Sequence, residues 1–149
     1  MTERSVVVGR DGRAKAFRPL PKAERRTAIA AGLAAYDRGD FFEAHEDLEP
    51  AWMGTDDLTE RALLQGLIKV AAAYVHDARG NPAGITRNLE GARALLGEAA
   101  ANGPSVNAAG IDLDALIADV DLRLGDLAAN PDGPVLEPPT LVRLQRSVP

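Results

Sequence analysis

The sequence predicts an all-α protein: a compact antiparallel bundle of about five helices, with an extended N-terminal arm and a proline-rich C-terminal tail. Apolar residues recur every three or four positions through most of the chain, which is the spacing of helices with one buried face. Short clusters of glycine, asparagine and proline interrupt this pattern and mark turns. At 149 residues, 46% apolar and 26% charged, the chain is typical of one globular domain with a sizeable core.

The first two helices are defined by their boundaries. Pro21 is expected to begin the first helix, because a proline at the first helical position loses no hydrogen bond. Ile29 and Tyr36 lie seven residues apart and therefore share a helical face. Gly39 is expected to end this helix in the left-handed conformation, and Asp40 to cap the second helix. The second helix then carries the stretch FFEAHEDLEPAWMG.

Three further helices follow from the same pattern. The third is predicted over residues 57–79, the fourth over residues 81–101 and the fifth over residues 112–129. Gly80 is expected to stop the third helix, and residues 102–104, Asn-Gly-Pro, break the fourth. The apolar positions that repeat at helical spacing are Leu64, Ile68, Ala71, Val75 and Ala78, then Ile85, Leu89, Ala92, Leu95 and Leu96, and finally Leu113, Leu116, Ile117, Val120, Leu124 and Leu127.

Both ends of the chain are predicted to be extended. We expect residues 1–20 to form a basic arm, residues 21–129 the helical bundle domain, and residues 130–149 a tail packed on the bundle. Prolines in the tail exclude a helix there. A short hairpin strand is predicted at Ser5–Val8. The apolar tail residues expected to lie along the bundle are Leu136, Leu141, Val142 and Leu144.

The net charge of −5 is unevenly distributed. Met1–Arg26 contains eight basic and three acidic residues, so the remainder of the chain carries the acidic excess. A basic arm on an acidic body could contact nucleic acid. We instead expect a solvated arm that lies partly on its own acidic body, because the basic residues are not interleaved with a series of aromatic stacking platforms.

Several classes of protein are excluded or disfavoured by composition. The chain has no cysteine, which excludes disulfides and thiolate metal sites. The absence of cysteine is also consistent with the expected cytoplasmic location. No apolar run approaches the ~20 residues of a membrane span, and the N-terminal stretch does not resemble a secretion signal. The sequence contains no phosphate-binding loop, nucleophile elbow or dinucleotide fingerprint.

The stretch FFEAHEDLEPAWMG, Phe41–Gly54, holds one of the two histidines and the only tryptophan. Because residues four and seven apart share a helical face, His45, Glu49 and Trp52 lie on a stripe roughly 60° wide. Phe41 and Leu48 flank the stripe, so we expect it to face inward. Burying an imidazole and a carboxylate without partners costs several kcal/mol. Polar partners are therefore expected on a neighbouring helix.

The third helix offers such partners. Gln65, Lys69 and His76 lie at spacings of four and seven, again on one face. The short loop between the second and third helices makes them antiparallel neighbours, which places Gln65 and Lys69 within one turn of His45. His76 is expected ~15 Å further along, at 1.5 Å of rise per residue. That separation argues against a metal ion shared by both histidines.

At these residues the chain resembles a known family. The pattern His-x-x-x-Glu-x-x-Trp, here His45, Glu49 and Trp52, is similar to the signature of the bacterial and archaeal domain of unknown function 309. A second similar stretch is Gln65-Gly66-Leu67-Ile68, followed by His76 and Gly80-Asn81. The resemblance covers roughly Ala35–Leu96. It implies an all-helical bundle and a label of metal-dependent hydrolase.

Two positions bear on the resemblance. Leu64 stands where the family often has an aromatic residue. Pro50 directly follows Glu49, removes one helical hydrogen bond and disfavours helical geometry at Glu49. The second helix is expected either to kink at Pro50 or to begin a new turn there.

Three functions remain open from the sequence, and whether the protein is an enzyme is among the open points. The favoured interpretation is a structural or small-ligand role for five residues, His45, Glu49, Trp52, Gln65 and Lys69. In the structural case they form a buried hydrogen-bonded network. In the ligand case they form the polar edge of a pocket, and Lys69 attracts an anionic ligand. The first alternative is a metal-dependent hydrolase in which one divalent ion is held by His45, Glu49 and His76.

The second alternative is a protein-interaction module whose helical hairpins offer a groove. A homodimer through an exposed face is expected only from how common dimers are. No membrane partner is expected.

Overall fold

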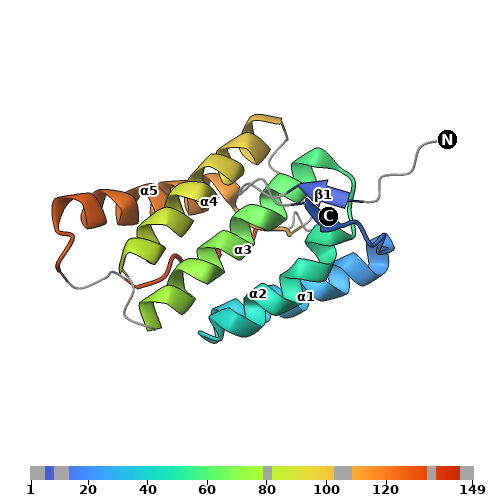
Figure 1. Ribbon diagram of the computed structural model, residues 1–149, viewed down its shortest axis with the longest axis horizontal. Helices are drawn as coiled ribbons and strands as arrows, with labels where there is room; N and C mark the ends of the chain where they lie inside the picture. The colour runs from blue at the N-terminus through green and yellow to red at the C-terminus, as the bar shows by residue number, and fades with distance from the viewer. Residues whose placement is uncertain (1–5, 9–13, 79–81, 103–108, 134–136, 145–149) are drawn as a thin grey trace, which may run out of the picture.

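The computed structural model describes residues 6–8, 14–78, 82–102, 109–133 and 137–144; side chains are described from residue 17 onward, apart from those of residues 76–78 and 82. Within these residues the chain forms a hairpin followed by five helices, which confirms the predicted all-α bundle (Figure 1). The elements are β1 (Val6–Val8), β2 (Ala14–Ala16), α1 (Lys22–Asp37), α2 (Phe41–Met53), α3 (Leu58–Ala78), α4 (Pro82–Asn102) and α5 (Leu113–Ala129).

The helices pack mainly against their neighbours in sequence: α1 against α2, α2 against α3, α3 against α4, and α4 against α5. In Figure 1, α3 lies at the centre, with α1 and α2 on one side and α4 and α5 on the other. The two strands pair antiparallel, with Val7 opposite Lys15, so the predicted hairpin strand is present over Val6–Val8. No helix in the described ranges is both long and apolar enough to cross a membrane.

The helix ends follow the local chemistry of the sequence. Gly39 adopts a positive φ of 82°, as expected of a glycine that ends a helix. The Asp40 side chain accepts a hydrogen bond from the backbone N–H of Glu43 at 3.4 Å, and Asp112 caps α5 by accepting from the N–H of Ala115 at 3.0 Å. These caps fix where α2 and α5 begin.

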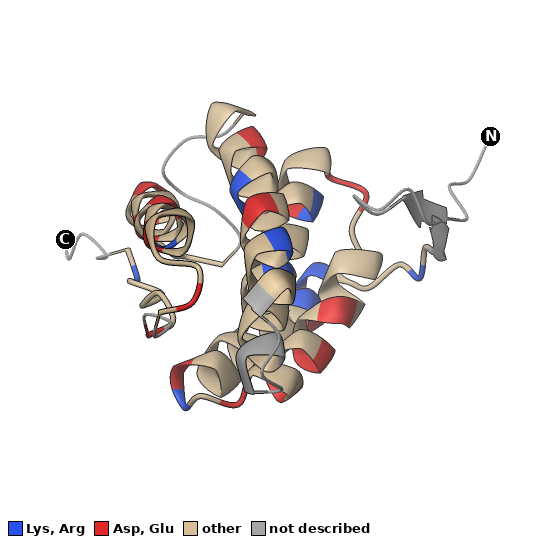
Figure 2. Ribbon diagram, turned by 60° about the vertical axis from the view of Figure 1, so that its left-hand side comes forward, with Lys and Arg blue, Asp and Glu red and all other residues tan. Residues whose placement is uncertain are grey.

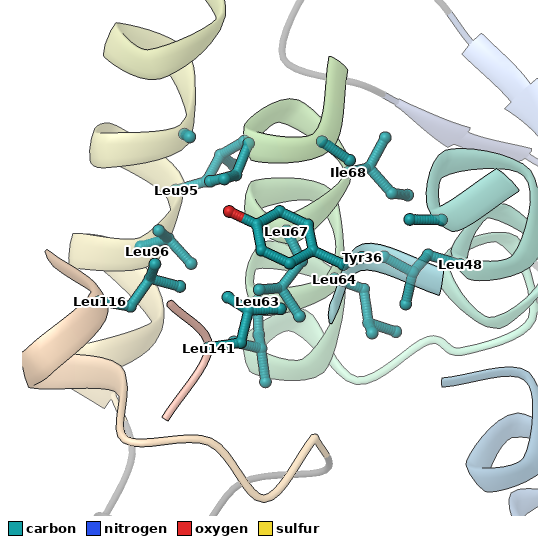
Figure 3. Close-up of a cluster of buried hydrophobic side chains, with 14 of the residues drawn as sticks. Tyr36, Leu48, Leu63, Leu64, Leu67, Ile68, Leu95, Leu96, Leu116 and Leu141 are labelled. Carbon is teal, nitrogen blue, oxygen red and sulfur yellow. The ribbon is translucent and has the colours of Figure 1, made fainter. Parts of the chain in front are cut away.

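The core is a single cluster of aliphatic side chains around α3, joined by Tyr36 from α1 (Figure 3). Two glycines allow close approach of the helices. A Cβ on Gly66 would come within 2.8 Å of Leu96 Cδ2, so α3 and α4 meet at this position. A Cβ on Gly32 would collide with Leu48, which brings α1 against α2. The largest side chains with almost no exposure are Leu48, Leu63, Leu64, Leu67, Ile85, Leu89, Leu96, Ile111 and Leu116.

The residues on either side of the bundle are tied to it by backbone hydrogen bonds. The N–H groups of Arg18 and Leu20 donate to the carbonyls of Met53 and Gly54, so the end of the arm runs beside the end of α2. In the tail, Leu141 is 5% exposed, as predicted for a residue along the bundle. Val142 is 46% exposed and does not join the core, because alternate residues of an extended segment point to opposite sides. Leu136 lies outside the described residues.

Pro50 does not divide the second helix. The helix α2 runs without interruption from Phe41 to Met53 with Pro50 inside it. Pro50 is exposed, so the carbonyl that loses its helical partner lies on the solvent side, where water can replace the bond. Glu49 therefore keeps its place on the same helical face as His45.

Candidate functional site

The candidate site lies along the line where α2 meets α3. We call it the α2–α3 seam and define it by His45 and Glu49 of α2 and Gln65 and Lys69 of α3. All four residues are half-buried, and the side chains of His45 and Glu49 retain 31% and 28% of their exposure. The seam is thus the edge of the helix interface and borders both the core and solvent.

His45 faces two carboxylates without hydrogen bonding to either. Its Nδ1 lies 4.0 Å from Glu49 Oε2 and 4.0 Å from Glu46 Oε1. A hydrogen bond between these atom types requires about 2.7–3.2 Å. The predicted one-turn spacing of His45 and Glu49 is therefore present, but the two side chains are not hydrogen bonded to each other.

The predicted contacts across the seam are not formed. Among the described residues, neither Gln65 nor Lys69 makes a hydrogen bond or ion pair with His45 or Glu49. A Cβ on Gly91 would lie 3.0 Å from Lys69 Cδ and 3.8 Å from Lys69 Nζ. The lysine side chain therefore runs over α4. The missing Cβ at Gly91 leaves room for it there, and this explains why the expected network does not form.

The seam residues are nevertheless at the same level of the bundle. The rings of Phe41 and Tyr74 lie 5.7 Å apart, which aligns the start of α2 with the end of α3. One turn further along antiparallel helices, His45 comes level with about residue 70. Lys69 is therefore within a turn of His45, as predicted, whereas Gln65 is five residues from the level of His45 and lies within a turn of Glu49 instead. The side chain of His76 lies outside the described residues.

Trp52 occupies a different environment from the rest of its stripe. It is 5% exposed and belongs to the hydrophobic core cluster. The helical face that carries His45, Glu49 and Trp52 thus passes from the half-buried edge of the bundle into the core over about two turns. Trp52 is therefore a core residue, whereas His45 and Glu49 lie at the edge of the core.

The described residues contain no group of three or more histidine, aspartate or glutamate side chains that could hold a metal ion. His45 and Glu49 provide two donors, and a structural zinc site in proteins uses four while a catalytic one uses three. The described side chains thus include two of the three ligands predicted for a metal ion, and the third, His76, lies outside them. The seam carries one imidazole, one carboxylate, one amide and one ammonium group, and the carboxylate of Glu46 lies beside its imidazole.

A second polar cluster was not predicted from the sequence. Arg25 of α1 donates through Nε to Glu60 Oε1 at 3.1 Å, and Thr55 Oγ1 donates to Glu60 Oε2 at 3.0 Å. Arg25 also donates to the carbonyl of Leu20 at 2.5 Å. Thr55 is 2% exposed, and the side chains of Arg25 and Glu60 are 19% and 15% exposed. We call Arg25, Thr55 and Glu60 the loop cluster, since they join α1 to the loop between α2 and α3.

The only signal for the loop cluster in the sequence was its helix cap. Asp57 accepts a hydrogen bond from the backbone N–H of Glu60 at 2.8 Å, and its own N–H donates to Thr55 Oγ1 at 3.2 Å. An aspartate followed three residues later by a glutamate is typical of a helix start. The partner Arg25 is 35 residues before Glu60 and could not be inferred from that pattern.

Comparison with protein families supplies one match. The model of the domain of unknown function family DUF309 matches residues 29–88. Residues 29–88 therefore belong to the DUF309 family. The matched segment contains most of α1, all of α2 and α3 and the start of α4, so every residue of the seam lies within it, whereas α5 and the tail do not. Comparison with curated proteins found no match, and comparison with solved structures found none either.

Proposed function

We propose that this DUF309 protein binds a small polar ligand at the α2–α3 seam. The observation that carries the proposal is that His45 and Glu49 are half-buried without a hydrogen bond to each other, and that half-buried Gln65 and Lys69, at a similar level of α3, pair with neither of them. Polar groups that serve only to hold helices together are expected to be paired, because an unpaired buried group costs about 1–3 kcal/mol. The loop cluster in the same protein meets that expectation and the seam does not.

The charges of the seam define the ligand. Lys69 offers an ammonium group for a carboxylate or phosphate, while Glu46 and Glu49 offer acceptors for N–H groups beside the His45 imidazole. Acidic and basic residues are interspersed along the helices of the bundle (Figure 2). A ligand that carries both an acidic group and an amine therefore matches the seam better than a simple anion.

The competing functions are a metal-dependent hydrolase built on His45 and Glu49 and a protein-interaction module. Neither has a further observation in its favour, since the described residues supply only two donors and the helix-to-helix faces are already packed. The family assignment does not decide among them, because the family is defined without a function.

The proposal is tested by NMR titration of 15N-labelled protein with glycine, acetate and methylammonium. We expect glycine to shift amide resonances around His45, Glu49, Gln65 and Lys69 at lower concentration than either single-group probe. Lys69→Met should weaken binding of glycine and acetate and leave methylammonium unaffected. Lys22→Met is the matched control, because Lys22 is an exposed lysine at the start of α1 and should leave all three titrations unchanged.

Two results would count against the proposal. Shifts scattered over the surface, or shifts that persist in Lys69→Met, would mean that the seam is not the binding site. A near-stoichiometric transition metal in the purified protein, lost in His45→Ala without unfolding, would favour the hydrolase instead.

A further inference from the structure

On α2, the line of polar residues in the α2–α3 seam continues into an exposed aromatic residue. Phe42 is three residues before His45 and seven before Glu49, so the three side chains lie on one face of the helix. Phe42 is 57% exposed, whereas the neighbouring Phe41 packs against the hydrophobic core. The first turn of α2 therefore adds an apolar surface beside the polar residues of the seam.

The part of α3 at the same level is apolar as well. The contact between the rings of Phe41 and Tyr74 brings the first turn of α2 level with the last turns of α3. Ala72 and Val75 lie at this level, and both are half-buried. Among the described residues, neither belongs to the core cluster or to the side chains packed against it. We call Phe42, Ala72 and Val75 the apolar end of the seam.

The apolar end lies on the same edge of α3 as the polar residues. Ala72 is seven residues after Gln65 and three after Lys69, and Val75 follows three residues later, so these positions follow one side of the helix. The α3 side of the seam thus changes from an amide, through an ammonium group, to two apolar side chains. The antiparallel α2 side changes in the same direction from a carboxylate, through an imidazole, to an aromatic ring.

The apolar end fits a small apolar group better than the surface of another protein. A single exposed apolar residue is common on proteins, and a specific protein interface buries about 800 Å² on each partner. The other large apolar side chains that are exposed among the described residues lie elsewhere: Leu58 begins α3 at its opposite end, Leu122 is in α5 and Val142 follows α5. Phe42 therefore has no large exposed apolar neighbour with which to form such an interface.

We propose that the ligand of the seam is a free α-amino acid with a large apolar side chain, and that the apolar end selects this class. The inference rests on the proposed function and specifies its ligand. Lys69 lies within a turn of His45, so the donor for a carboxylate and the acceptors for an amine lie at nearly one level. That arrangement suits a ligand whose amine and carboxylate share one carbon atom.

In this assignment each part of the amino acid has its own partners. Lys69 donates to the carboxylate, and Glu46 and Glu49 accept from the ammonium group. The side chain lies against Phe42 and Val75, where it removes apolar surface of both the ligand and the protein from water. Glycine has no side chain and gains nothing from the apolar end.

The test compares leucine, glycine and N-acetylleucinamide by NMR titration of the full-length 15N-labelled protein. Leucine should shift the seam amides that glycine shifts, together with those of Phe42 and Val75. It should bind about tenfold more tightly than glycine, which is expected from burying about half of its side chain. N-acetylleucinamide has the same side chain but neither charge, and should bind more weakly than leucine.

Two variants test the apolar end. Phe42→Ser removes the exposed ring and should lower the ratio of the leucine affinity to the glycine affinity from about ten to about two or less. Val75→Thr keeps the shape of the side chain, replaces a methyl group by a hydroxyl and should lower the same ratio about twofold to threefold. Leu122→Ser is the matched control, since Leu122 is 61% exposed on α5 and its loss should leave the ratio unchanged. If Phe42→Ser does not fold by circular dichroism, Val75→Thr decides the test.

The outcomes separate this inference from the proposed function. If glycine binds at the seam and leucine binds no more tightly, the apolar end does not select the ligand, and the proposed function stands without it. A ratio unchanged in folded Phe42→Ser and in Val75→Thr, or binding of N-acetylleucinamide as tight as that of leucine, would likewise overturn the inference. If neither amino acid shifts the seam amides, the proposed function fails, and this inference fails with it.

Discussion

The loop cluster and the α2–α3 seam are both polar groups placed at helix junctions, and they are built in opposite ways. In the loop cluster, Glu60 accepts from Arg25 and from Thr55, so both of its carboxylate oxygens are used. In the seam, His45 and Glu49 approach only to 4.0 Å and their expected partners lie elsewhere. The difference teaches that this fold pairs its polar groups where they hold helices together. Polar groups left unpaired at a half-buried position remain available to bind a ligand.

The largest effect should come from breaking the loop cluster. Glu60→Ala leaves the buried Thr55 hydroxyl and the Arg25 guanidinium without their acceptor, which should lower the free energy of unfolding by about 3 kcal/mol. For a chain of this size that corresponds to a fall in Tm of roughly 6–12 °C. Thermal unfolding followed by circular dichroism measures it. Asp121→Ala is the control, because it removes the exposed Arg93–Asp121 pair and should cost under about 1 kcal/mol.

A smaller loss is expected at Tyr36, another paired polar group. Tyr36→Phe removes the hydrogen bond to Pro139 and should cost about 1 kcal/mol at neutral pH. Burial raises the pKa of Tyr36 in the folded protein, so the unfolded chain ionises first as pH rises. The stability that depends on neutral Tyr36 is present below about pH 10 and is lost above it. Between pH 8 and pH 11, the free energy of unfolding measured in urea should decrease less for the variant than for wild type. Equal decreases would mean that other groups cause the loss of stability at high pH.

At the seam, His45→Ala should change stability by less than about 1 kcal/mol, because the imidazole is partly exposed and has no hydrogen bond to lose. The same substitution should abolish the glycine-dependent NMR shifts of the seam. Urea unfolding and the titration together separate the two roles. A decrease in the free energy of unfolding of more than about 2 kcal/mol would mean that His45 stabilises the fold, as Glu60 does.

The smallest effect on stability should be at Gly91. An added Cβ would lie 3.0 Å from Lys69 Cδ, a flexible stem that can move aside, while alanine favours the helix by up to about 1 kcal/mol. Gly91→Ala should therefore leave Tm nearly unchanged but move the Lys69 ammonium and alter the affinity for acetate. Gly125→Ala is the control, since its Cβ would meet no atom within 4 Å. An acetate affinity that does not change in Gly91→Ala would mean that Lys69 is not held there.

Local patterns predicted most of the fold. Gly39, Asp40 and Asp112 mark helix boundaries through backbone chemistry that depends on adjacent residues alone, and the structure confirms each. Pro21 also marks a boundary, but it precedes α1 as its cap residue and does not take the predicted first helical position. The absence of a side chain at Gly66 allows the close approach of Leu96 from α4, and this contact also depends on a single position. The one-turn relation of His45 to Glu49 is local in the same sense.

Local sequence patterns could not predict the contacts between segments that are distant in the sequence. The direction of Lys69 depends on the absence of a side chain at Gly91 on another helix, so the network expected from α3 alone does not form. The Arg25–Glu60 pair joins residues 35 apart, and Tyr36 and Pro139 are 103 apart. Their pairing requires the three-dimensional order of the helices, which periodicity does not contain.

The most direct test of the unpaired seam is a double-mutant cycle on Glu49→Gln and Lys69→Met, measured by urea unfolding without added ligand. Since these side chains make no contact, the decreases in the free energy of unfolding caused by the two single substitutions should add to within about 0.3 kcal/mol in the double variant. A coupling energy above about 1 kcal/mol would show that the lysine and the glutamate stabilise each other across the helices. The seam would then be a structural network like the loop cluster, with no role left open for a ligand.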